Sequence, residues 1–300
     1  MGIYAVVLVS LLAGIFLQRI PGTRDRLTPA LNWFAIYIAL PAIVLAKIPL
    51  LDLNADALFA MSSAWVCMLI SIAIFIPLGK VLNWERETIL VCITLAGLGN
   101  TAFLGLALIE WLASDRVLAF AIIYDQLGSF IVLSLACPLI LSLHKKTEER
   151  ISALSIAKSV VLFPPFLSLM IALTLPIEPI TELLQTSLEW LGLSLLPIAM
   201  LVVGMQMSFK IKRSYLVPAA AALSYKMLAF PLLVFLFGAA LSIESDILRA
   251  SLLQSAMPPM VTPTIFLISL NLAPRFAAFM LGLGTILSFL TIPTIAFLLN

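Results

Sequence analysis

The sequence predicts an all-α polytopic membrane protein with ten transmembrane helices, arranged as two inverted five-helix repeats. Three observations predict this fold class. The 300 residues are 63% hydrophobic and 11% charged, whereas about 25% of the residues in soluble domains are charged. The apolar residues form continuous runs, unlike the period-two alternation of barrel strands. The fourth and ninth runs are interrupted near their centres, so we expect helices 4 and 9 to be broken and to cross.

A helix that crosses the hydrocarbon core needs about 20 predominantly apolar residues. Ten runs come close to this length, and the first is short. They cover residues 2–17, 31–49, 55–79, 88–109, 117–142, 155–175, 187–209, 214–241, 247–269 and 275–299.

The charges in the loops predict the orientation. Loops that follow odd-numbered helices hold 13 of the 17 Lys and Arg residues, and the opposite loops hold three. Lys and Arg accumulate on the cytoplasmic side of a membrane. We therefore expect a multi-pass protein of a bacterial-type inner membrane with both termini external.

The basic loop 143–154 divides the chain into a first repeat, 1–142, and a second repeat, 155–300. Five helices per half place the second half in the membrane from the opposite face. Residues 40–45 (Leu-Pro-Ala-Ile-Val-Leu) recur 156 residues later as Leu-Pro-Ile-Ala-Met-Leu, and Gly128 recurs as Gly284 at the same offset. The two interruptions recur at nearly the same offset. These matches predict an inverted repeat.

The interruption of the ninth helix contains three prolines, at 258, 259 and 263. Each proline lacks a backbone N–H and clashes with the carbonyl four residues before it. The interruption of the fourth helix contains Asn100 and Thr101 between glycines. From the rise of an α-helix, Asn100 lies roughly 18 Å from the inner face and Pro258 roughly 17 Å from the outer face. Both interruptions therefore reach the centre of a hydrocarbon core about 30 Å thick.

Broken backbone inside a membrane is tolerated where it lines a cavity. A pair of interrupted helices in corresponding positions points to a transporter's binding site, and helix N-termini there would attract an anion. We therefore expect substrate to bind at Asn100, Thr101, Met257, Pro258 and Pro259. The alternative is that Pro and Gly only kink two packed helices.

Two charges, Asp125 and Lys226, lie deep in predicted helices. An ionisable residue inside a membrane is costly and indicates a function by default. Asp125 could exchange a coupling proton and Lys226 could balance an anionic substrate, or the two could form a structural ion pair. Four other charges lie near helix ends, where snorkelling to the interface would explain them. These are Lys47, Glu110, Glu189 and Arg249.

The remaining chemistry-bearing residues predict no cofactor and no metal. The three cysteines, Cys67, Cys92 and Cys137, lie in apolar runs without a CxxC pair, and the single His144 lies in a charged loop. This pattern suggests neither a disulfide framework nor a zinc site. The net charge of +2 is spread over loops, so we expect no nucleic-acid partner.

Together these features resemble the auxin efflux carrier family, a relative of the bile-acid symporters whose bacterial members are often called malate permeases. The similarity spans nearly the whole chain. It implies a scaffold of helices 1, 2, 6 and 7 beside a mobile core of helices 3–5 and 8–10. It rests on residues 40–45, on 99–105 (Gly-Asn-Thr-Ala-Phe-Leu-Gly), on Lys226 followed by Pro231, and on 255–259 (Ser-Ala-Met-Pro-Pro).

The resulting hypothesis is a secondary transporter of small organic anions, with carboxylates as the leading class and a proton or sodium as the coupling ion. One rival is a sodium-coupled carrier of the bile-acid symporter type. A second is a polytopic membrane enzyme, which would need a catalytic Asp pair, a Ser–His pair or a metal motif. The sequence leaves import or export open, and a homodimer is one option for the assembly.

Overall fold

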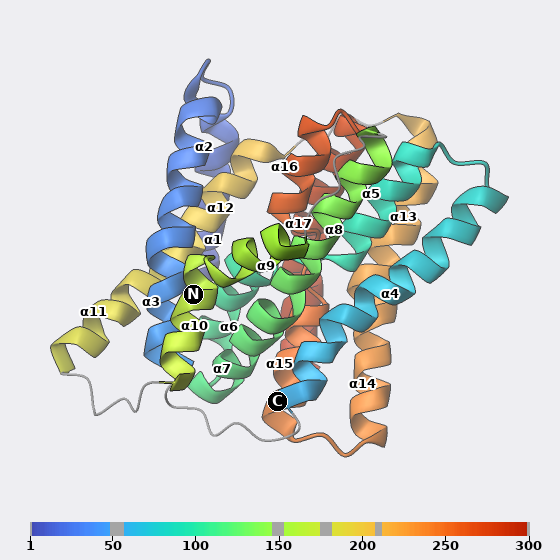
Figure 1. Cartoon of the computed structure of the whole chain (residues 1–300). Helices are drawn as coiled ribbons and strands as arrows, with labels where there is room; N and C mark the ends of the chain where they lie inside the picture. Colours follow the sequence, from blue (N-terminus) through green and yellow to red (C-terminus); the bar gives the residue numbers. More distant parts are fainter. Residues whose placement is uncertain (1, 49–56, 146–152, 175–181, 208–211, 299–300) are drawn as a thin grey trace.

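The computed structural model describes residues 2–48, 57–145, 153–174, 182–207 and 212–298. These residues form helices and turns, with no β-strand among them (Figure 1). The first half contains α1 (Gly2–Leu17), α2 (Thr23–Phe34), η1 (Ala35–Ala39), α3 (Leu40–Lys47), α4 (Ala57–Val81), α5 (Arg86–Gly97), η3 (Thr101–Leu106), α6 (Ala107–Leu112), α7 (Asp115–Ile123), η4 (Tyr124–Ser129) and α8 (Phe130–Lys145).

The second half has the same helical character. It contains α9 (Ala153–Val161), α10 (Pro164–Thr174), α11 (Glu182–Leu193), α12 (Leu195–Gln206), η5 (Arg213–Tyr215), α13 (Leu216–Ser224), η6 (Tyr225–Ala229), α14 (Phe230–Ala240), α15 (Ser245–Ser255), α16 (Val261–Ser269) and α17 (Pro274–Leu298).

The all-helical prediction is confirmed for the described residues, and helix occupies each of the ten predicted ranges. Within the described part of the chain, six continuous helices are long and apolar enough to cross a membrane by length and composition. The count of ten crossings stays a prediction. The six are Thr23–Lys47, Ala57–Val81, Asp115–Cys137, Glu182–Gln206, Arg213–Ala240 and Pro274–Phe297.

Four stretches of π-helix, which were not predicted, interrupt the α-helices: η1, η3, η4 and η6. Proline explains two of them. Pro41 and Pro231 follow η1 and η6 at the second position of the next helix. Each proline leaves the carbonyl four residues before it without a partner, and the wider π turn relieves the clash. Such π-bulges occur often at functional sites.

The helices form two side-by-side groups (Figure 1). We call α1, α2, η1, α3, α10, α11 and α12 the small bundle. The large bundle contains the elements from α4 to α8 and from α13 to α17. In the small bundle, α1 packs along α12, where a Cβ on Gly14 would lie only 2.9 Å from the Cα of Gly204. Small residues allow this close backbone approach between membrane helices.

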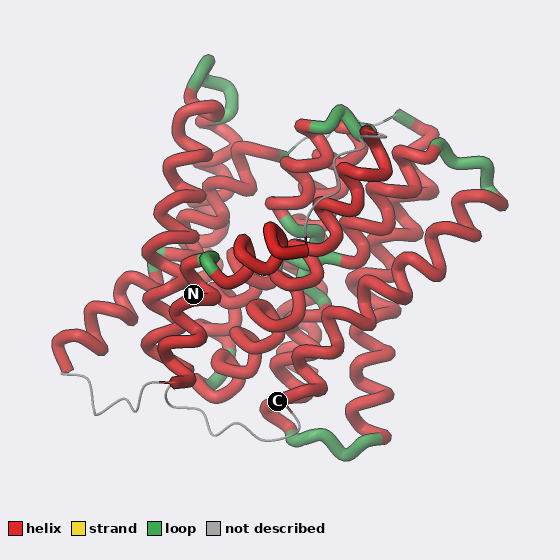
Figure 2. The backbone as a smooth tube through the Cα atoms, in the orientation of Figure 1, coloured by secondary structure: helices red, strands yellow, loops and turns green. Residues whose placement is uncertain are grey.

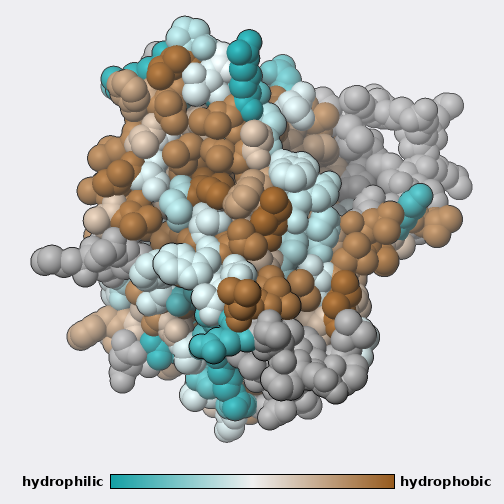
Figure 3. Space-filling model, turned by 90° about the vertical axis from the view of Figure 1, so that its left-hand side faces the viewer, coloured by the Kyte–Doolittle hydropathy of each residue, from teal (hydrophilic) through white to brown (hydrophobic). Residues whose placement is uncertain are grey.

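The exterior is largely apolar. Many large hydrophobic side chains on α1, α4 and α14 are exposed, among them Val9, Leu69 and Phe237. Figure 3 shows one face with brown apolar residues across its middle and the largest hydrophilic groups toward its upper and lower ends. This distribution fits a surface that faces hydrocarbon between two aqueous ends.

Candidate functional site

The two predicted interruptions meet inside the large bundle. Helix α5 ends at Gly97 and α15 ends at Ser255. Gly99 and Pro259 then form an isolated antiparallel β-bridge. The N–H of Asn100 donates to the carbonyl of Pro258 over 2.7 Å, and the N–H of Met260 donates to the carbonyl of Leu98 over 3.1 Å. Figure 2 shows loop segments in the interior of the bundle.

The local backbone follows from the residues present. Pro258 and Pro259 have no N–H to continue α15, whereas Pro263 falls in the first turn of α16, where a proline costs no hydrogen bond. Asn100 has φ −75° and ψ 62°, the values of an inverse γ-turn. The N–H of Thr101 accordingly donates to the carbonyl of Gly99 over 2.8 Å. We call the stretches 98–101 and 255–260, which contain this pairing, the crossover.

The side chain of Asn100 is the unexplained polar group of the crossover. Asn100 is fully buried, and neither Nδ2 nor Oδ1 has a hydrogen-bond partner among the described residues. Leaving a buried donor or acceptor unpaired costs on the order of 1–3 kcal/mol. Such a group in a native structure calls for a partner that completes it, and a bound ligand would do so.

Asp125 lies on η4 and contacts the crossover. Its Oδ1 accepts a hydrogen bond from the Thr101 hydroxyl at 2.5 Å, and its Oδ2 accepts one from Nε2 of Gln126 at 2.7 Å. Asp125 is buried, with 1% of its surface exposed. A hydroxyl can donate to a carboxylate and accept from a carboxylic acid, so the Thr101 contact suits both protonation states of Asp125.

Lys226 lies on the other side of the crossover. Its Nζ donates to the carbonyl of Ser255 over 3.0 Å, at the C-terminal end of α15, where a cation is favoured. A Cβ on Gly99 would lie 3.0 Å from this Nζ, so the glycine leaves room for the lysine. Within the described ranges no ion pair joins Lys226 to Asp125. The lysine bonds Ser255 at the end of α15, whereas the carboxylate bonds Thr101 at the start of η3.

A cavity of about 80 Å³ lies between the crossover and the small bundle. Of the described residues that line it, Asp125 alone is charged. Ala102, Phe103 and Thr262 belong to the first turns of η3 and α16, so two helix N-termini adjoin the cavity. Its lining residues are Ile36, Leu40, Ala102, Phe103, Asp125, Phe130, Leu133, Phe163, Met260 and Thr262.

Two phenylalanines cover part of this cavity. Phe130 begins α8 and Phe163 lies in the turn between α9 and α10. Their rings stack with centroids 3.9 Å apart and planes 15° apart. Asp125 is buried whereas Thr262 is exposed, so the cavity runs from the interior toward the surface, with the aromatic pair along its wall.

Two larger hollows carry less chemistry. One, of about 310 Å³, is lined by apolar residues of η6, α14, α15 and α17. The other, of about 340 Å³, lies among α4, α5 and α8. Among the described residues that line this second hollow, Thr94 carries the one hydroxyl, which is already bonded to the carbonyl of Leu90. Neither hollow gathers polar groups around a ligand, so the smaller cavity beside Asp125 is the better candidate.

The structure brings together part of the predicted site. Asn100, Thr101, Met257, Pro258 and Pro259 all lie at the crossover. The cavity, however, is lined by their neighbours Ala102, Phe103, Met260 and Thr262. Lys226 lies behind the crossover and does not line the cavity.

Sequence reasoning missed three aromatic side chains, Phe103, Phe130 and Phe163. Apolar residues within apolar segments carry no individual signal, although Pro164 and Pro165 do mark the turn that holds Phe163.

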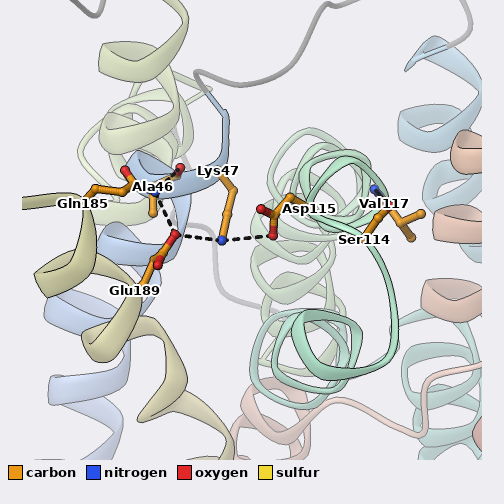
Figure 4. Close-up of polar contacts among 7 residues, drawn as sticks. All are labelled: Ala46, Lys47, Ser114, Asp115, Val117, Gln185 and Glu189. Carbon is orange, nitrogen blue, oxygen red and sulfur yellow. Dashed lines mark hydrogen bonds and ion pairs between the residues drawn. The ribbon is translucent and has the colours of Figure 1, made fainter. Parts of the chain in front are cut away.

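The structure corrects one interpretation. Lys47 was expected to snorkel to the interface, but its side chain is only 7% exposed and forms ion pairs with Asp115 at 3.0 Å and Glu189 at 3.2 Å (Figure 4). Glu189 also accepts a hydrogen bond from Gln185. The lysine therefore joins α3 and α11 of the small bundle to α7 of the large bundle.

Comparison with known proteins agrees with this picture. A family model described as "Membrane transport protein" matches residues 3–296. An uncharacterized transporter of Methanocaldococcus jannaschii is 24% identical over 268 residues, which cover 86% of this chain and 85% of the relative. Together with the apolar helices, the match makes this a multi-pass membrane protein. The chain belongs to the membrane transport protein family, the auxin efflux carrier family that its motifs resemble.

Proposed function

We propose that this protein is a secondary transporter that binds a small organic anion, with carboxylates as the leading class, beside the crossover and releases it on the other side of the membrane. The observation that carries the proposal is the buried, unpartnered Asn100 amide at the paired breaks, beside a cavity that two helix N-termini adjoin. Ligand sites are usually concave and apolar, with a few convergent polar groups. This cavity has that character.

The charges around the cavity suggest how binding is coupled to a proton. The N-termini of η3 and α16 favour an anion, but an ionised Asp125 would repel one in a medium of low dielectric constant. Protonation of Asp125 removes the repulsion. Anion and proton would therefore bind together, and Lys226 would supply a positive background from behind Gly99.

The movement itself would follow from the two bundles. We infer ten membrane crossings, with repeats 1–142 and 155–300 inverted about the loop 143–154 and both termini on the outside of an inner membrane. The small bundle corresponds to helices 1, 2, 6 and 7 of the predicted scaffold, and the large bundle to the mobile core. Relative movement of the two would expose the cavity to each side in turn.

Sodium is the alternative coupling ion. Oε1 of Gln126 and Oε1 of Gln254 are buried without a hydrogen-bond partner in the described part of the chain, and both side chains are bonded to residues of the site: Gln126 to Asp125, and Gln254 to the carbonyl of Thr101. Carboxylate and amide oxygens are ligands that hard cations prefer. A sodium ion could therefore take the place of the proton.

Uptake of radiolabelled carboxylates into liposomes that contain the purified protein tests the proposal. Uptake should rise with an imposed pH difference, and Asp125→Asn should remove this dependence while sparing exchange at equal pH. A dependence on a sodium gradient instead would select the alternative ion. Failure of every carboxylate to enter, with conversion of one of them, would favour a membrane enzyme.

A further inference from the structure

Glu110 is a partly buried carboxylate that has no role in the proposed site. It lies on α6 of the large bundle, next to the loop that leads to Asp115. Its Oε2 is buried and has no hydrogen-bond partner among the described residues. An unpaired carboxylate oxygen in the protein interior is costly, so a partner in another conformation would explain its presence.

Lys47 lies one helical turn along α3 from the level of Glu110. A Cβ on Gly192 would lie 3.5 Å from Oε1 of Glu110 and 3.3 Å from the Cβ of Ile43, so Glu110 faces α3 and α11 at the level of these two residues. Lys47 follows Ile43 by four positions on α3, and Glu189 precedes Gly192 by three on α11. Residues with these spacings lie one above the other on a helix face.

The carboxylates around Lys47 belong to different bundles. Glu189 belongs to the small bundle, like Lys47, and Gln185 holds it by a hydrogen bond of 2.9 Å. Asp115 and Glu110 both belong to the large bundle. A movement of the large bundle along α3 would therefore carry Asp115 away from Lys47 while Lys47 and Glu189 stay together.

We propose that Lys47 passes from Asp115 to Glu110 when the large bundle slides by about one helical turn, roughly 5 Å, so that the two ion pairs define two resting positions. This inference rests on the proposed transport function. Lys47 keeps Glu189 in both positions. The exchange gives the buried lysine a second carboxylate in each position, so that no partner is lost without a replacement. One-turn steps between packed elements are a known form of conformational switching. Lys47 is thus a positioning residue.

The test uses a cysteine at Thr262, which is exposed at the cavity in the present position, in a background without Cys67, Cys92 and Cys137. Glu110→Gln removes the second partner and should raise the rate of Thr262→Cys labelling by a membrane-impermeant thiol reagent. Asp115→Asn removes the first partner and should lower it. We expect the labelling rate to change by at least about threefold, upward in Glu110→Gln and downward in Asp115→Asn. Adding Lys47→Met to either variant should abolish the change. Glu182→Gln, an exposed carboxylate on α11, should change nothing.

A purely structural role would move both labelling rates in the same direction, and that result would overturn the proposal, as would no change in either variant. Size-exclusion chromatography confirms that each variant is folded, and Lys47→Arg replaces Lys47→Met if the latter aggregates. Uptake by the unmodified protein is measured separately. If the unmodified protein takes up solute but the variants label at the wild-type rate, only the ion-pair exchange is rejected. If the labelling rates change in opposite directions but no solute is taken up, only the transport of the solutes offered is rejected.

Discussion

The hydroxyl of Thr101 lies 2.5 Å from Oδ1 of Asp125, and this contact joins the crossover to the buried carboxylate of η4. Thr101 is the first residue of η3, directly after the turn at Asn100. A change in the charge of Asp125 therefore acts on the backbone at which the two breaks pair. This bond directly connects the predicted coupling residue with one of the predicted binding residues.

We predict that Thr101→Val lowers uptake and also stability, because the valine has nearly the same shape but leaves Oδ1 of Asp125 without its donor. Loss of a hydrogen bond to a buried charged group costs on the order of 1–3 kcal/mol. Thr101→Ser keeps the hydroxyl and should retain most uptake. The measurements are thermal unfolding in detergent and uptake into liposomes. Equal behaviour of the two variants would show that the hydroxyl has no such role.

The second prediction concerns the crossover itself. Asn100→Ala and Pro258→Ala should each strongly reduce uptake while the protein remains folded and inserted. Alanine at 100 removes the amide that has no partner in the described structure, so no native hydrogen bond is lost with it. Alanine at 258 restores a backbone N–H that can extend α15 and disturb the bridge between Gly99 and Pro259.

Uptake at the wild-type level in both variants would contradict this prediction. It would mean that the breaks only kink two packed helices. A further readout is protection of the protein by substrate against thermal unfolding, since a ligand that binds the native state raises its apparent stability. We expect this protection to be lost in Asn100→Ala.

The breaks could be predicted from sequence because their causes are local. Pro258 and Pro259 remove donors wherever they occur, and the glycines around Asn100 weaken a helix in any context. The prediction that the two breaks meet followed from the depth of each break in the membrane, which was calculated from the rise of its helix. The prediction therefore needed no knowledge of side-chain packing.

The ion pairs of Lys47 could not be predicted from local sequence. Its distance from the helix end suggested an interfacial lysine, but its ion-pair partner Glu189 lies 142 residues away in sequence. A tertiary pairing of this kind leaves no local pattern. For a related reason the sequence could not predict that Phe103, Phe130 and Phe163 line the cavity, because one apolar residue in an apolar run resembles the next.

The third prediction tests the orientation. The asymmetry of Lys and Arg places the loop 241–244 outside and Lys158, in the last turn of α9, inside. In a background without native cysteines, an impermeant thiol reagent applied to intact cells should label Ser242→Cys. It should label Lys158→Cys only after the cells are opened. Both side chains are exposed, so access to the reagent depends on the side of the membrane. The reverse pattern would invert the proposed topology.

The last prediction concerns the aromatic pair along the cavity. Phe163→Ala removes a ring that stacks on Phe130 with centroids 3.9 Å apart. The pair itself contributes about 0.5–1.5 kcal/mol beyond its buried area, so we expect a modest loss of thermal stability. The main effect should be on selectivity. A cavity of about 80 Å³ would widen, and bulkier carboxylates should compete better for uptake than they do in the wild type.

The controls separate cavity shape from general loosening. Phe163→Tyr preserves the stacked ring and should keep wild-type selectivity. Phe237→Ala truncates an exposed phenylalanine on α14, 62% of which is accessible, far along the chain from the cavity residues, and should leave the competition profile unchanged. If Phe163→Ala lowers uptake of all carboxylates equally, the pair supports the fold near α9 and α10 but does not set which solutes fit. If only the bulky solutes gain, the ring at Phe163 sets the upper size of the substrate.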